Sequence, residues 1–284
     1  MTGGGTPRMT APAMTATSPA PSAARPSPLR VIAALVGRDL RRFFRQPSRV
    51  VGSVAQPLIL WVVLGAGLGD SFQVAGASGT RYLTYFYPGT IVLTMLFTAI
   101  FSTMSVIDDR HHGFLQAVLV APVSRASLVL GKTLGGVTIA LFQAVALVAL
   151  APLAGFSLAA ANLGLVFAAL ALAAIGFTAL GFAVAWWIDS TQGYHGIMSV
   201  ALIPLWMLSG AMFPAGGGSS WVRALMLADP MTYAVSAVRR GLHGANLPPG
   251  LLPPSSSAFS ELAITAVFAA TSLILATILC RRRA

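Results

Sequence analysis

Charged side chains are scarce in this sequence. Only 9% of its 284 residues are Asp, Glu, Lys or Arg, against about 25% in a typical soluble domain, whereas 56% are hydrophobic. So few charges cannot keep the surface of a soluble domain hydrated, and the apolar residues cluster in long blocks. The composition therefore excludes a soluble globular domain and favours a protein that crosses a membrane several times.

Cysteine and acidic residues are also rare. Cys280 is the only cysteine, so no internal disulfide is possible. Seven Asp and Glu stand against 18 Lys and Arg, which gives a net charge of +11. Such a balance could suggest nucleic acid, but the basic residues flank the apolar blocks and form no soluble basic face. The sequence therefore predicts no nucleic-acid partner.

Motifs for metal binding and catalysis are missing as well. The four histidines, His111, His112, His195 and His243, lie in separate segments without the spacing of a metal site. There is no HExxH or GxSxG motif. Residues 126–133 end in Gly-Lys-Thr but have Ala where a P-loop needs its first glycine. We therefore expect no catalytic, metal or cofactor site in this chain.

Six apolar blocks are long enough to span a membrane, since a spanning helix needs about 20 apolar residues. They are expected at residues 50–69, 86–107, 130–152, 161–187, 195–213 and 258–280. The sequence thus predicts an all-α integral membrane protein with six transmembrane helices. Ionisable groups are nearly absent within these predicted spans, which argues against an ion-driven secondary transporter. Lys132, near the start of the third span, is expected to snorkel towards the membrane surface.

The two ends of the chain differ from the spans. Residues 1–28 are rich in Pro, Ala, Ser and Thr and are predicted to be a disordered tail. Residues 29–46 place most arginines off an apolar stripe, which predicts a basic amphipathic helix at the membrane surface; the alternative is an ordinary packed helix. Residues 281–284 form a basic C-terminal tail.

The distribution of Lys and Arg predicts the orientation. If both termini lie in the cytoplasm, most of the basic residues lie on the cytoplasmic side, as the positive-inside rule requires. The inverted arrangement places most of them outside. With a composition typical of a GC-rich bacterium, the sequence predicts a multi-pass protein of the bacterial inner membrane with both termini cytoplasmic.

The predicted cytoplasmic loop between the second and third spans carries a short apolar helix between charged residues. Its apolar side chains follow an i, i+1, i+4, i+5 pattern and share one helical face. They are Phe114, Leu115, Val118 and Leu119. Pro122 ends this helix, because proline breaks the hydrogen-bond ladder. The segment is either a lever that a cytoplasmic partner holds or a simple connection.

This loop resembles that of ABC-2 type permeases, the membrane subunits of many bacterial ATP-binding-cassette exporters. The matching residues are Asp109, Arg110, Gly113, Leu119, Ala121, Pro122, Val123, Ser124, Arg125, Gly131 and Lys132. A second match, residues 208–214 and the segment after them, includes Pro214, Trp221, Asp229, Pro230, Tyr233 and Arg239. Asp229 stands where the family usually has Asn, and residues 114–116 read Phe-Leu-Gln where Thr-Leu-Glu is more common.

The resemblance implies that residues 29–280 form an ABC-2 type transmembrane domain. Such a domain pairs with a second permease subunit, identical or paralogous, and binds cytoplasmic ATPase subunits that hold ATP and Mg. The residues implied in ATPase coupling are Asp109, Arg110, Gly113, Phe114, Leu115, Val118, Leu119, Pro122 and Arg125. Those implied in an outer re-entrant segment are Pro214, Trp221, Asp229, Pro230, Tyr233 and Arg239.

Several alternatives remain open from the sequence. The leading function is outward movement of an amphiphilic or lipid-like substrate; the others are a membrane anchor without a transport path and a secondary transporter. Asp229 is expected to pair with Arg239 or Arg240, or to lie in a solvated loop. The glycines of the third and fourth spans serve either helix packing or a lipid-like substrate. They are Gly131, Gly135, Gly136, Gly164, Gly176 and Gly181.

Overall fold

The structure is a computed structural model that describes residues 27–68, 81–121, 123–212, 214, 219–253 and 256–282. Every regular element in this part of the chain is a helix, which confirms the predicted all-α fold. Residues 1–26 of the predicted disordered tail and the last two residues of the predicted basic tail lie outside the described residues. The first helix, α1 (Pro28–Phe44), begins inside the predicted tail, because Ser27 caps it by accepting a hydrogen bond from the Arg30 N–H.

Six helices are long and apolar enough to span a membrane, as predicted. They are α2 (Pro47–Leu68), α3 (Tyr82–Ser102) with its continuation α4 (Met104–His111), α6 (Arg125–Ala149), α7 (Leu163–Trp187), α8 (Thr191–Trp206) with the π-helical turn η3 (Met207–Ala211), and α11 (Ala258–Arg282). Several predicted ends are wrong by about a turn. The second span continues through the charged residues of α4, and the third begins at Arg125, where Ser124 caps the helix.

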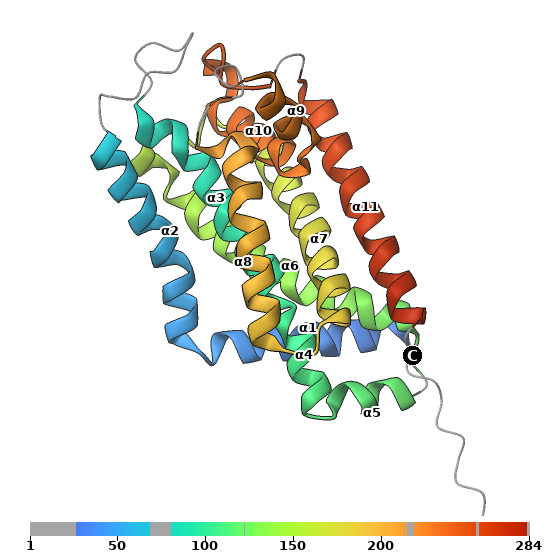
Figure 1. Ribbon diagram of the computed structural model, residues 1–284. Coiled ribbons are helices and arrows are strands. Elements are labelled where there is room, and N and C mark those ends of the chain that lie inside the picture. Colours follow the sequence, from blue (N-terminus) through green and yellow to red (C-terminus); the bar gives the residue numbers. More distant parts are fainter. Residues whose placement is uncertain are drawn as a thin grey trace, which may run out of the picture.

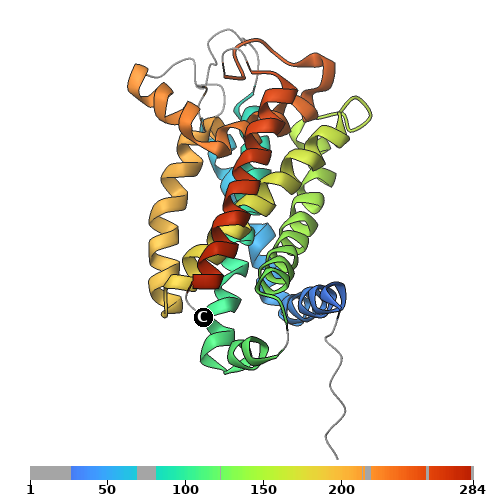
Figure 2. The same cartoon turned by 90° about the vertical axis from the view of Figure 1, so that its right-hand side faces the viewer.

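Shorter helices lie at the two ends of the bundle. They are α5 (Phe114–Val120), α9 (Ser220–Ala228), α10 (Pro230–His243) and the 3-10 turns η2 (Ala151–Ala154) and η5 (Gly244–Asn246). Helix α1 crosses one end, with α5 beyond it, and α11 also finishes there (Figure 1). We call this the α5 end. Helices α9 and α10 lie at the opposite end, the α10 end, and a quarter turn of the molecule gives the same separation (Figure 2).

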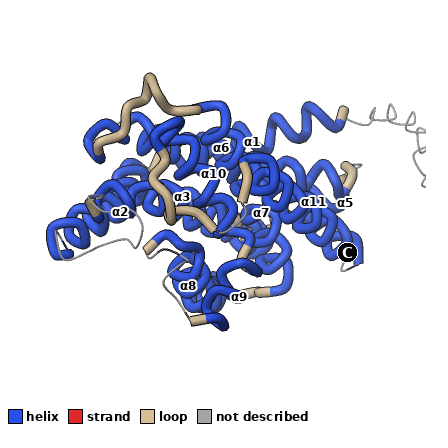
Figure 3. The backbone as a smooth tube through the Cα atoms, turned by 90° about the horizontal axis from the view of Figure 1, so that it is seen from above, coloured by secondary structure: helices blue, strands red, loops and turns tan. Residues whose placement is uncertain are grey.

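Helices α3, α6 and α7 form the interior of the bundle. They are the most buried of the spanning helices, whereas α2 and α11 are the least buried. Seen from the α10 end, α2, α8 and α11 lie around the outside (Figure 3). Glycines allow the helices to approach closely: a Cβ atom on Gly136 of α6 would lie 2.7 Å from the Thr178 methyl of α7, and one on Gly176 of α7 would lie 2.6 Å from the Phe268 ring of α11. These contacts favour the packing alternative for these two positions.

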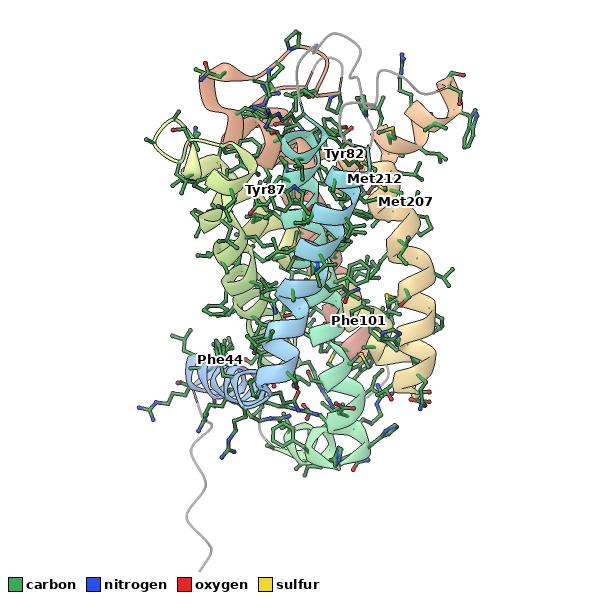
Figure 4. All side chains as sticks on the ribbon, turned by 90° about the vertical axis from the view of Figure 1, so that its left-hand side faces the viewer. Phe44, Tyr82, Tyr87, Phe101, Met207 and Met212 are labelled. Carbon is green, nitrogen blue, oxygen red and sulfur yellow. The ribbon has the colours of Figure 1, made fainter. Side chains whose placement is uncertain are left out.

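Helix α1 packs one stripe against α6. Leu35, Asp39 and Phe43 are its buried residues, spaced four apart on one face. Leu35 fits over Gly131, where an added Cβ would lie 2.7 Å from the Leu35 side chain. Phe44 is the last residue of α1 (Figure 4). Its ring meets that of Phe142 edge to face, with ring centroids 5.2 Å apart. The packed-helix alternative thus accounts for one face of α1, and its placement at a membrane surface stays a prediction.

Candidate functional site at the α5 end

Four charged side chains meet inside the α5 end. Lys132 of α6 places its Nζ 2.6 Å from Asp109 Oδ2 and 3.2 Å from Asp39 Oδ2, and it also donates to Ser105 Oγ at 3.3 Å. The second oxygen of Asp109 accepts from Arg38. Lys132, Asp39 and Asp109 are buried. We call Arg38, Asp39, Asp109 and Lys132 the four-charge cluster; its two positive and two negative charges balance.

The neighbours of Asp109 in α4 attach to two other elements. Asp108 accepts a hydrogen bond from Arg42 of α1 at 2.8 Å. Arg110 donates to the Trp186 carbonyl at the end of α7 at 2.9 Å and pairs with Asp189 in the connection to α8. Three consecutive residues thus tie the base of the α4–α5 turn to α1, to α6 and to the α7–α8 connection.

The turn into α5 is made by Gly113. Its φ of 73° lies in the left-handed region, which glycine adopts at no steric cost. Directly after it, the Phe114 ring lies under the Arg38 guanidinium, 3.8 Å from centroid to Cζ. This cation–π contact connects α5 to the four-charge cluster.

The apolar face of α5 packs largely within this chain. Leu115 is 3% exposed and belongs to the core, and Phe114 and Val118 pack against that core. The prediction that this face needs the membrane or an ATPase groove is wrong for Leu115, because Leu115 is already buried within this chain. The side chain of Leu119 and residue Pro122 lie outside the described residues.

The opposite face of α5 is exposed in the described part of the chain. Gln116 and Ala117 are exposed, and Val120 is 88% exposed. Arg125, the remaining residue predicted for coupling, opens α6, and its Nη1 atom is buried without a hydrogen-bond partner among the described residues. Residues 126–133 lie inside α6, so they do not form the loop that a P-loop requires.

The α10 end divides into a buried helix and a peripheral one. Most of α10 is buried, with Pro230 in its first turn. In α9 only Met226 is buried, and Trp221 is 66% exposed. Tyr233 joins the two helices by donating to the Leu227 carbonyl at 2.8 Å. The two helices thus differ in burial, and Pro214 lies in the connection before α9.

The predicted ion pair of Asp229 is wrong. Asp229 caps α10 by accepting from the Met231 N–H at 2.8 Å, and Arg239 lies ten residues further on, about 15 Å along a helix axis. Arg240 pairs instead with Glu261 of α11, with both contacts at 3.0 Å. Arg239 is buried and donates to the Gly210 carbonyl at 2.9 Å and the Leu251 carbonyl at 3.0 Å. The solvated-loop alternative is also wrong, because Asp229 is buried.

Two titratable groups at the α10 end have shifted pKa values. Burial raises the pKa of Asp229 to about 7, and the hydrogen bond from Met231 only partly opposes this shift. Burial, together with the smaller effect of the positive charge of Arg239, lowers the pKa of His243 to about 4. Both groups therefore favour their neutral forms at this end of the molecule.

The expectation that the spans nearly lack ionisable groups is also corrected. Lys132 lies within the third span and, instead of snorkelling, points to the carboxylates of α1 and α4. Glu261, near the start of the last span, is fully buried against Arg240. Each of these charges has an opposite charge beside it, as buried charges require.

Comparison with known proteins identifies the family. A family model described as ABC-2 type transporter matches residues 30–243. The chain belongs to the ABC-2 type transporter family. The match contains α1 from Arg30 onward, α5, the four-charge cluster and α10. It ends before α11, so the predicted domain boundary at residue 280 stays a prediction.

Individual relatives of this ABC-2 type transporter chain carry permease names. Two are named putative transport permease ycf38: that of Cyanophora paradoxa is 27% identical over 209 residues, covering 72% of this chain and 71% of the relative, and that of Porphyra purpurea is 28% identical over 214 residues, covering 74% and 73%. A third is the daunorubicin resistance ABC transporter permease protein DrrB1 of Streptomyces coeruleorubidus, 25% identical over 209 residues, covering 73% of each chain. This chain is thus a permease component of a transporter.

Sequence reasoning missed part of the site of this ABC-2 type transporter chain. Asp109 and Arg110 were predicted, but their partners Arg38, Asp39, Arg42 and Asp189 were not. One signal was present: Asp39 is the only acidic residue among the arginines of residues 29–46. A single acidic residue on a basic helix, and a single lysine in an otherwise apolar span, indicate that Asp39 and Lys132 form a pair.

Proposed function

We propose that this chain is the membrane-spanning subunit of an exporter whose ATP is hydrolysed by a separate cytoplasmic subunit, and that the exposed face of α5 binds that subunit. The observation that carries this proposal is the position of α5. It lies beyond the ends of the spanning helices (Figure 1). One face of α5 is packed on the chain, and the other is exposed and includes Val120. The membership of the chain in the ABC-2 type transporter family supports an ATP-binding-cassette partner.

The proposal places the α5 end in the cytoplasm of a bacterial cell and both termini on that side. The arginines of α1, together with those at the end of α11, support this orientation through the positive-inside rule. The α10 end then faces outward. ATP-driven motion arises in the cytoplasm and must enter through a cytoplasmic element, and α5 is such an element.

The exposed faces of the peripheral helices support the proposed pairing with a second permease subunit. Helices α2, α8 and α11 carry exposed large apolar side chains along their length. In a membrane such side chains meet lipid or another transmembrane helix. We propose that a second permease subunit, identical or paralogous, covers part of these faces and that lipid covers the rest.

The proposed cargo is an amphiphilic or lipid-like small molecule. The name of one relative refers to daunorubicin resistance, which supports a small organic substrate and outward transport. In the described part of the chain, the longest connection between spans, from η3 to α11, holds only α9, α10 and η5. The absence of a larger domain there favours such a substrate over a large polymer. A membrane anchor without a transport path remains the rival function and predicts no ATP-dependent movement of any small molecule.

A single substitution on α5 tests the ATPase partner. Val120→Asp places a carboxylate on the exposed face and leaves the buried contacts of Leu115 intact. We expect the purified subunit to lose most of its copurifying ATPase, because a charge desolvated at an interface costs several kcal/mol. Leu153→Asp is the matched control, since Leu153 is also highly exposed but lies in η2, after the other end of α6. Equal copurification of both variants, or no ATPase with the wild type, would overturn the proposal.

A further inference from the structure

Burying the four-charge cluster carries a high energetic cost. Moving a charged side chain out of water costs several kcal/mol even after relaxation, and a buried ion pair is often no more stable than apolar side chains of similar size. The Lys132 and Asp109 side chains are 2% and 5% exposed. The cluster is therefore poorly explained as a device for stability alone.

The cluster joins a spanning helix to the two elements at the α5 end. Lys132 belongs to α6, Asp39 and Arg38 to α1, and Asp109 to α4. From Lys132 the contacts continue through Asp109 to Arg38, and from Arg38 to the ring of Phe114 in α5. A displacement of α5 thus reaches α6 through one ring contact and two ion pairs.

The helix packing around the cluster leaves little freedom for α1 to slide over α6. A Cβ on Gly135 would lie 3.2 Å from Asp39 Oδ2, and one on Gly131 would meet Leu35. Glycines at these two positions bring α1 close enough to α6 for Asp39 to reach Lys132. Packing and charge therefore hold α1 and α6 in one relative position.

We infer that Lys132 is a positioning residue for coupling: through Asp39 and Asp109 it makes α1, the α4–α5 turn and the start of α6 move as one body. This inference rests on the proposed function, in which the ATPase displaces α5. The neighbouring pair of Arg42 and Asp108 does not have this role, because its side chains are 41% and 31% exposed, and exposed pairs contribute only about 0–1 kcal/mol.

The test measures motion between the α4–α5 turn and α6 directly. Spin labels on exposed His111 at the end of α4, outside the exposed face of α5, and on exposed Leu134 of α6 report their distance in the complex with the ATPase, in a Cys280→Ala background, with and without ATP. We expect the wild-type distance to stay the same when ATP binds, because the two helices move together. In the variant Lys132→Met with Asp39→Asn, which keeps the cluster neutral, we expect ATP to change that distance.

Two further measurements separate positioning from folding. The double variant Arg42→Met with Asp108→Asn removes one charge of each sign from the surface pair and should keep the wild-type behaviour. The amount of ATPase that copurifies should be the same for all variants, since the exposed face of α5 is unchanged. The number of ATP molecules hydrolysed per molecule transported should rise at least about fivefold in the cluster variant alone. Loss of folded protein would lower transport and hydrolysis together and leave this ratio unchanged.

Three results would overturn the inference: an ATP-dependent change of the distance in the wild type, an unchanged distance in the cluster variant, or the same loss in the surface-pair variant. If the cluster variant does not fold, the single variant Lys132→Arg is measured in its place. This variant keeps the positive charge on a longer side chain, and it should fold and keep the distance fixed when ATP binds. A wild-type chain that binds no ATPase would instead contradict the proposed function.

Discussion

At the scale of single residues, Asp229 and His243 give the α10 end opposite responses to pH. The folded state favours protonated Asp229, whose pKa rises from 3.8 to about 7, so this group destabilises the fold as pH rises through that range. The folded state favours neutral His243, whose pKa falls from 6.5 to about 4, so this group destabilises the fold as pH falls through that range. The two effects oppose each other between about pH 4 and pH 6.5.

Removing each group should expose the effect of the other. Asp229→Asn keeps an acceptor at the helix cap but removes the carboxylate. Only the effect of His243 then remains, so the melting temperature of this variant should increase as pH rises from about 4 to 6.5. His243→Gln should instead melt at lower temperature as pH increases from about 4 to 7. Thermal unfolding of the detergent-solubilised protein over this pH range measures both. Parallel profiles for the two variants would contradict the assigned pKa shifts.

At the scale of elements, the contact between α3 and the π-helical turn η3 depends on Gly89. A Cβ on Gly89 would lie 2.9 Å from the backbone Cα of Ala211, and the Gly89 carbonyl accepts the Trp206 indole N–H at 3.1 Å. The neighbouring Gly210 adopts a φ of 76° and offers its carbonyl to Arg239. The end of α8 is thus fixed by a close backbone contact and by a buried arginine.

Gly89→Ala should therefore destabilise the protein by about 1–3 kcal/mol, because the methyl group must displace backbone. Gly196→Ala is the matched control within a spanning helix, since a Cβ there meets nothing within 4 Å. Its effect should be neutral or slightly stabilising, as alanine favours helix over glycine. Unfolding in increasing SDS compares the two, and equal stabilities would show that η3 does not pack closely on α3.

At the scale of the whole molecule, the two ends of the bundle must lie on opposite sides of the membrane. Ser124, beside α5, and Ser219, before α9, are both exposed and make matched positions for cysteine. In a Cys280→Ala background, an impermeant maleimide added to intact cells should label Ser219→Cys and fail to label Ser124→Cys until the cells are opened. The reverse pattern would invert the orientation and remove α5 from reach of a cytoplasmic ATPase.

Sequence alone determined the number and approximate positions of the spans, because membrane insertion depends on a continuous apolar length that any window of about 20 residues reveals. It also indicated Asp109, Arg110 and the α5 segment, since their charges and apolar pattern are local. Only the tertiary structure decided the partners. Asp39 and Lys132 are 93 residues apart, and nothing local distinguishes a pair across helices from two separate charges. The expected Asp229–Arg239 pair failed for the same reason: the fold, and not proximity in the chain, determines which buried charges meet.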